Sequence, residues 1–180
     1  GKTFFAVSFH DISDTPAEIS RSGNPTMTVA ELMAQLSWLH NHGYQPVSLD
    51  QIVAARDGGP PLPDKAILLV FDDGYASTYT RVFPLLKLFD YPAVVALIGK
   101  WMDVPPDDTV KYGQRKIPRQ YFLNWEQVRD MQASGLVEIA SHSYDLHHAI
   151  RANPQGNRQP AATTRRFDAE NKTYESDDAF

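Results

Sequence analysis

The 180-residue sequence contains no cysteine, so neither a disulfide nor a thiolate metal ligand is available to it. Any metal ion would therefore have to be held by histidine and carboxylate side chains. No apolar run reaches the length of a membrane span, and no signal peptide is recognisable. The formal net charge of -5 argues against a nucleic-acid partner. The composition is that of a globular protein of one domain's size, long enough to bury a core.

A short apolar run that stops at two adjacent carboxylates is the most informative segment. Residues 68–71 are all apolar, which is typical of a parallel strand covered on both faces. Asp72 and Asp73 follow where this strand should end, and Gly74 permits a sharp turn. Active sites of parallel α/β proteins are built at this end of the strands. Two adjacent like charges favour a nearby divalent metal, although such a pair before glycine is also typical of a plain turn or a helix N-cap.

Strands and helices are predicted to alternate along most of the chain. Strands are expected at residues 3–9, 46–49, 66–71, 93–98 and 137–141, and helices at 28–43, 52–56, 77–89 and 124–134. Residues 99–121 are predicted to form a long loop, and residues 151–180 a loop-like or partly disordered segment. This alternation predicts an α/β fold with a parallel sheet. The chain would be either a small open sheet or, as we favour, the front part of a longer (β/α) barrel.

Local signals mark the boundaries of several of these helices. Thr28 with Glu31, and Asn124 with Gln127, have the spacing of N-terminal capping pairs. Pro84 falls inside the helix predicted at residues 77–89 and is expected to bend it.

Three of the predicted strands end in side chains that are capable of catalysis. The first ends at His10, the third at Asp72 and Asp73, and the fifth at His142. Parallel strands point their C-terminal ends the same way, so these groups are expected to converge at one edge of the sheet.

A second histidine follows His142 closely enough to join it on one ion. His147 lies five residues further on, in a loop that can turn back toward the strand end. With one carboxylate, the two imidazoles would form a two-histidine, one-carboxylate set with positions open for water and substrate. Clustered histidines at a strand end are also common as surface or structural residues, and His148 is a second candidate for the same position.

Two segments resemble motifs of the polysaccharide deacetylases of carbohydrate esterase family 4. Residues 70–74 (Val-Phe-Asp-Asp-Gly) are similar to the first motif, and residues 141–147 are similar to the second, which contains a metal-binding histidine pair. The usual spacing of that pair is four, whereas here it is five. This departure, and the position of His10 ahead of the aspartate motif, resemble the poly-β-1,6-N-acetyl-D-glucosamine N-deacetylases of biofilm export systems, whose motif order is circularly permuted.

The resemblance implies a role for each of five residues. Asp73, His142 and His147 would bind one divalent transition metal (Zn, Ni, Co or Fe), Asp72 would be the general base, and His10 the general acid. The implied reaction is hydrolysis of N-acetyl groups from poly-β-1,6-N-acetyl-D-glucosamine, with release of acetate. The sequence contains no match to the family's base-orienting arginine or oxyanion donor, which are expected beyond residue 180.

The resemblance also implies an architecture and a location. Residues 1–180 would form a polysaccharide deacetylase domain, incomplete at its C-terminus, with the first five strands of a deformed barrel of about seven. The implied location is the periplasm, with an outer-membrane lipid anchor on a leader that is absent here, as Gly1 in place of Met suggests. A further C-terminal domain is expected in the native protein.

Three aromatic residues near predicted strand-end loops, Tyr75, Trp101 and Trp125, are candidates for stacking on sugar rings. Aromatic residues at such positions also serve as core or loop anchors. Three other functions remain open at this point. These are deacetylation of chitin or peptidoglycan sugars, metal-retaining carbohydrate binding without turnover, and a purely structural α/β domain.

Overall fold

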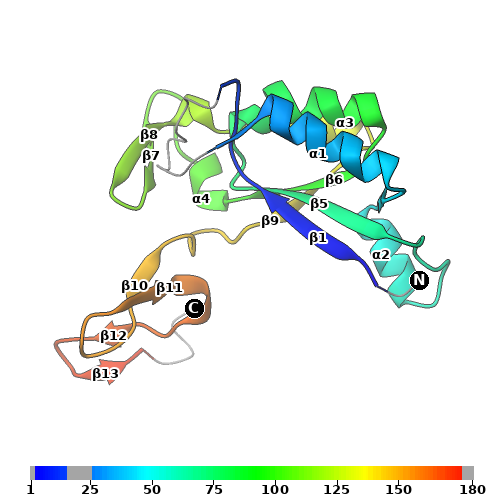
Figure 1. The fold of residues 1–180 in the computed structure, drawn as a ribbon. Helices are drawn as coiled ribbons and strands as arrows, with labels where there is room; N and C mark the ends of the chain where they lie inside the picture. The colour runs from blue at the N-terminus through cyan, green and yellow to red at the C-terminus, as the bar shows by residue number, and fades with distance from the viewer. Residues whose placement is uncertain (1–2, 16–25, 176–180) are drawn as a thin grey trace.

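The computed structural model describes residues 3–15 and 26–175 and is built around a five-stranded parallel sheet (Figure 1). The sheet runs in the order β1 (Phe5–Phe9), β5 (Ala66–Asp72), β6 (Ala93–Leu97) and β9 (Val137–Ser141), and β4 (Gln45–Pro46) also pairs with β5. The predicted α/β class and all five predicted strands are confirmed. The second strand is shorter than predicted, because Ser48 caps a helix that starts at Leu49.

The strand register aligns the C-terminal ends of the three strands that were expected to carry the site. Phe9 of β1 pairs with Phe71 of β5, and Asp72 pairs with Ala96 of β6. Leu97 pairs in turn with Ser141, the last residue of β9. The side chains that follow these strands therefore emerge at one edge of the sheet.

One face of the sheet is covered by helices. Figure 1 shows α1 (Val29–Asn41) and α3 (Phe83–Phe89) over this face, and α5 (Trp125–Ala133) contributes Val128 and Met131 to the same core. Alternate strand residues supply the other half of the core, including Phe9, Leu69 and Phe71. Phe9 and Phe71 stack with ring centroids 5.1 Å apart. The opposite set of alternate residues, on β1 and β5, is thereby left for the site.

Both predicted capping pairs are present as full capping boxes, at Thr28 with Glu31 and at Asn124 with Gln127. The helix predicted at residues 77–89 changes type along its length: a π-helical turn, η1 (Thr78–Val82), runs directly into α3. Pro84 lies in the first turn of α3, next to this change of helix type. The bend expected at Pro84 stays a prediction.

The prediction of a structureless loop at residues 99–121 was wrong. This segment contains α4 (Gly99–Met102), an antiparallel hairpin of β7 (Thr109–Tyr112) and β8 (Arg115–Pro118), and a 3-10 turn, η2 (Arg119–Tyr121). Val110 and Ile117 pair across the hairpin and are buried against Trp101 and Phe122. Each of these strands is only four residues long, so the two-residue periodicity is too short to stand out in the sequence. Gly113, with φ of 59°, makes the turn.

Residues 149–175 extend away from the sheet (Figure 1). They form two short hairpins, β10 (Ala149–Arg151) with β11 (Arg158–Pro160) and β12 (Phe167–Asp168) with β13 (Thr173–Tyr174), separated by η3 (Ala161–Thr163). The segment predicted to be loop-like thus contains paired strands. The prediction also covered residues 176–180, which lie outside the described ranges. A further parallel pair, β2 (Ile12–Ser13) with β3 (Met27–Thr28), leads into α1. None of the helices in the described ranges could cross a membrane.

A carboxylate from the far strand of the sheet fixes the start of α2 (Leu49–Arg56). Glu138 of β9 accepts hydrogen bonds from the N–H groups of Leu49 at 2.6 Å and of Asp50 at 3.2 Å. A helix start has unpaired N–H groups and a positive dipole end, so an anionic acceptor stabilises it. Glu138 therefore ties a helix early in the chain to a strand 88 residues later.

We expect Glu138→Ala to lower the free energy of unfolding by about 1–2 kcal/mol, because two hydrogen bonds to a charged acceptor are lost. Glu138→Gln should lose less, since its amide oxygen can still accept a bond. Chemical denaturation would measure both changes. Asp107→Ala removes an exposed carboxylate and serves as the control; equal stabilities of the Glu138→Ala and Asp107→Ala proteins would contradict the proposed tie.

Candidate metal centre

Two consecutive residues in the left-handed conformation end β5 and turn Asp73 into the site. Asp73 has φ of 71° and Gly74 has φ of 70°. Aspartate is one of the few non-glycine residues that adopt this conformation readily. At Gly74 the requirement is stricter, because a Cβ atom there would lie 2.8 Å from Leu97 Cδ2. The N–H of Leu123 donates to the Gly74 carbonyl at 2.8 Å and holds the turn in place.

A second turn, after β9, brings two histidines together. The N–H of His142 continues the sheet by donating to the Leu97 carbonyl at 2.8 Å, and Ser143 then adopts φ of 69°. The Ser143 hydroxyl accepts the N–H of Leu146 at 3.0 Å, which closes the loop. The imidazole rings of His142 and His147 consequently lie with their centroids 5.3 Å apart.

The Asp73 carboxylate lies between these two imidazoles. Its Oδ1 atom is 3.2 Å from His147 Nε2 and 3.5 Å from His142 Nε2. Its side chain is fully buried, yet within the described residues neither carboxylate oxygen has a hydrogen-bond partner. Ligand atoms that are each about 2.1 Å from one ion lie roughly 3.0–3.4 Å apart. The three side chains therefore have the donor types and spacing of a transition-metal site.

The charge balance around Asp73 also fits a cation. Burial raises the pKa of the Asp73 carboxyl, because the charged form is taken out of water. His147, His10 and His142 act against this and lower the pKa, and the charge of Asp72 raises it further. A cation among these groups would stabilise the ionised carboxylate that burial disfavours.

The structure brings together the three implied metal ligands, Asp73, His142 and His147. His10 is exposed and directly follows β1, the strand that pairs with β5. Asp72 is half-buried and accepts a hydrogen bond from the hydroxyl of Ser8. His148 is exposed and lies outside the ligand set of Asp73, His142 and His147.

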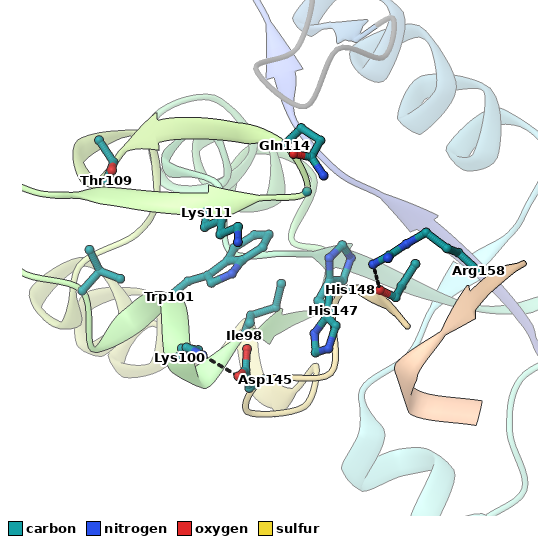
Figure 2. Close-up of a pocket in the computed structure, with 13 residues that line it drawn as sticks. Ile98, Lys100, Trp101, Thr109, Lys111, Gln114, Asp145, His147, His148 and Arg158 are labelled. Carbon is teal, nitrogen blue, oxygen red and sulfur yellow. Dashed lines mark hydrogen bonds and ion pairs between the residues drawn. The ribbon is translucent and has the colours of Figure 1, made fainter. Parts of the chain in front are cut away.

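Two of the three candidate stacking residues are core residues. Tyr75 is 2% exposed and offers no ring face to a sugar, so the prediction for it was wrong. Trp101 is 6% exposed but lines the pocket in Figure 2, so its stacking role stays a prediction. Trp101 also packs edge-on against the His147 ring, with centroids 5.4 Å apart, and Tyr112 lies at the same distance. Trp125 is 50% exposed, so for it the stacking role stays a prediction.

Two pockets include His147 in their lining. Figure 2 shows the first, of about 570 Å³, with Lys111 and Arg158 at its wall and Lys100 paired to Asp145 at 2.5 Å. The second, of about 660 Å³, is lined by residues that include Tyr112, His142, His147 and Pro160. Each has the size of a small-ligand site, and both are also lined by His148 and Arg158.

Sequence reasoning missed Ser8, Tyr112 and Ser143 as contributors to this site. Ser8 lies on β1 two residues before His10, and this spacing is the one signal that could have revealed it. Tyr112 lies on the hairpin that was predicted as a loop. Ser143 lies within the histidine segment, but its left-handed turn leaves no distinct mark in the sequence.

Comparison with known proteins gives matches over most of the chain. The sequence profile of the polysaccharide deacetylase family matches residues 59–176. The poly-beta-1,6-N-acetyl-D-glucosamine N-deacetylase of Escherichia coli (strain K12) is 44% identical over 173 residues, which are 96% of this chain and 25% of that protein. The chain therefore spans about a quarter of the length of this relative.

Solved structures show the same fold. A de-N-acetylase from Aggregatibacter actinomycetemcomitans superposes with a TM-score of 0.87 at 40% identity, covering 97% of this chain and 67% of that one. The BpsB deacetylase domain from Bordetella bronchiseptica gives a TM-score of 0.80 at 42% identity, with the same coverage of both chains. The prediction of a fold of the polysaccharide deacetylase type is confirmed by these likenesses.

We expect Asp73→Asn, His142→Ala and His147→Ala each to weaken binding of a divalent transition metal by more than about tenfold, because each removes a ligand atom. Metal content after dialysis and calorimetric titration with Zn²⁺ would measure this. His148→Ala removes the neighbouring imidazole and should keep wild-type affinity. Loss of metal from the His148→Ala protein, with retention in His147→Ala, would reverse the assignment.

Proposed function

The chain belongs to the polysaccharide deacetylase family, and we propose that it is the catalytic part of a metal-dependent N-deacetylase of poly-β-1,6-N-acetyl-D-glucosamine. One observation carries the proposal: the buried Asp73 carboxylate lies between two imidazoles while a second carboxylate, Asp72, stands beside it. The substrate is taken from the name of the 44% identical relative.

In the proposed site, Asp73, His142 and His147 hold one divalent transition metal, which the donor set allows to be Zn, Ni, Co or Fe. An ion bound there supplies Lewis-acid chemistry, lowering the pKa of water and polarising an acetamide carbonyl. Three protein ligands leave coordination positions open, as catalytic sites require and closed structural sites do not.

Asp72 is the proposed general base. Asp73 is committed to the metal and cannot also accept a proton, so its neighbour must do so. One oxygen of Asp72 is engaged by Ser8, which leaves the other to take the proton of the attacking water.

His10 is the proposed general acid. The amide C–N bond breaks as the C–O bond to water forms, and the departing sugar nitrogen needs a proton. A protonated His10 at the end of β1 supplies it, so the products are acetate and a free amino sugar. Its imidazole is exposed at the edge of the sheet where the carboxylates lie, within reach of a bound polymer.

The pockets beside His147 support a polymeric substrate, and the exposed Trp125 is retained as a proposed stacking residue. Further parts of the proposal come from the family resemblance alone. They are periplasmic localisation, an outer-membrane lipid anchor on a leader, and a further domain in the native protein.

We expect Asp72→Asn to reduce acetate release from β-1,6-linked N-acetylglucosamine oligomers by about 100-fold or more, because the amide cannot accept a proton. Metal content should stay at the wild-type level, because Asp72 is outside the ligand set. Acetate release and metal content, measured on the same protein, test both statements.

Asp107→Asn, which neutralises an exposed loop carboxylate, is the matched control and should keep full activity. Normal turnover by Asp72→Asn would refute the assignment of the base. Faster acetate release from chitin oligomers than from the β-1,6-linked oligomers would show that chitin is the better substrate. Metal binding without acetate release from either would identify a binding module.

A further inference from the structure

We infer that Ser8 is the positioning residue that orients Asp72 for proton transfer; this inference rests on the proposed function. The Ser8 hydroxyl donates a hydrogen bond to Asp72 Oδ2 across two neighbouring strands, 64 residues apart in sequence. This bond fixes one oxygen of the proposed base directly from the sheet.

The strand register makes this contact a consequence of the sheet. Ser8 of β1 pairs with Val70 of β5, and Asp72 is two residues beyond Val70. Because side chains alternate between faces with a period of two, Asp72 projects from the same face as Val70 and Ser8. The hydroxyl is therefore supplied by a paired strand, which is a more rigid support than a loop.

A hydroxyl donor suits a carboxylate that must act as a base. An unheld carboxylate turns freely about its side-chain bonds, so one fixed oxygen sets the direction of the other. A single hydroxyl donor is sufficient for this orientation.

The proposed acid directly follows the same strand. β1 ends at Phe9, and His10 is the next residue. β1 therefore supplies the hydroxyl that holds the proposed base and leads directly into the proposed acid.

Ser8 is exposed, so loss of its hydroxyl should disturb the fold little, and its role can be tested in the intact chain. We expect Ser8→Ala to lower kcat for acetate release by roughly 10- to 100-fold with KM, metal content and Tm unchanged. Ser8→Thr keeps the hydroxyl on a residue suited to strands and should recover most of the activity. Thr80→Ala removes a hydroxyl that donates to the Ala76 carbonyl and is the matched control.

A double variant separates positioning from a general structural effect. Because Ser8 acts through Asp72, adding Ser8→Ala to Asp72→Asn should cause no further loss of kcat. A wild-type kcat in Ser8→Ala, failure of Ser8→Thr to recover activity, or fully additive losses in the double variant would each overturn the inference.

A structural measurement, which does not depend on turnover, tests this inference separately from the proposed function. In a crystal structure of the metal-loaded Ser8→Ala protein, we expect the Asp72 carboxylate to lose its single orientation. An Asp72 carboxylate that remains ordered as in the wild type would overturn the positioning role. If the wild-type protein releases no acetate from any oligomer, the proposed function fails, and this structural comparison still decides whether Ser8 holds Asp72.

Discussion

The buried carboxylate of Asp73 is the constraint on which the rest of the site depends. An ionised carboxylate away from water is costly unless a charge or hydrogen-bond donors compensate it, and the described part of the chain supplies it with no hydrogen bond. The local backbone is arranged to keep it there. Left-handed residues at Asp73, Gly74 and Ser143 hold the carboxylate and the histidine loop against one another. Such conformations persist at functional sites because surrounding contacts over-determine them.

Those contacts come from two cores that meet at the metal site. The sheet and its helices bury Phe71 and Leu97 beneath the strand ends, and the Leu97 side chain packs against Gly74, whose φ of 70° favours glycine. The hairpin core around Trp101 supports the His147 ring from the outer side. Aromatic packing of this kind limits the orientations available to the imidazole, as outer-shell groups do for metal ligands in general. Packing therefore restricts the His147 ring in particular.

The sequence was sufficient for those features that depend on near neighbours in the chain. The alternation of strands and helices, the capping boxes at Thr28 and Asn124, and the residues at the strand ends were predicted from local patterns. Contacts between distant segments could not be predicted in this way. The bond from Ser8 to Asp72 and the tie from Glu138 to α2 depend on strand order and register, which no local pattern specifies. Tyr75 was misjudged for a similar reason, because the burial of its ring depends on a hairpin that the sequence did not reveal.

The two adjacent aspartates have different proposed roles, and the strand ends between them. In a continuing strand, neighbouring side chains point to opposite faces, and Asp73 would face away from Asp72. The left-handed conformation at Asp73 stops this alternation one residue after β5 ends, so both carboxylates can serve one site. Asp72 remains part of the sheet, where a paired strand can hold it, whereas Asp73 belongs to the turn and is buried among the histidines. Their environments differ more than their positions in sequence suggest, and that difference allows one to bind a cation while the other stays available for a proton.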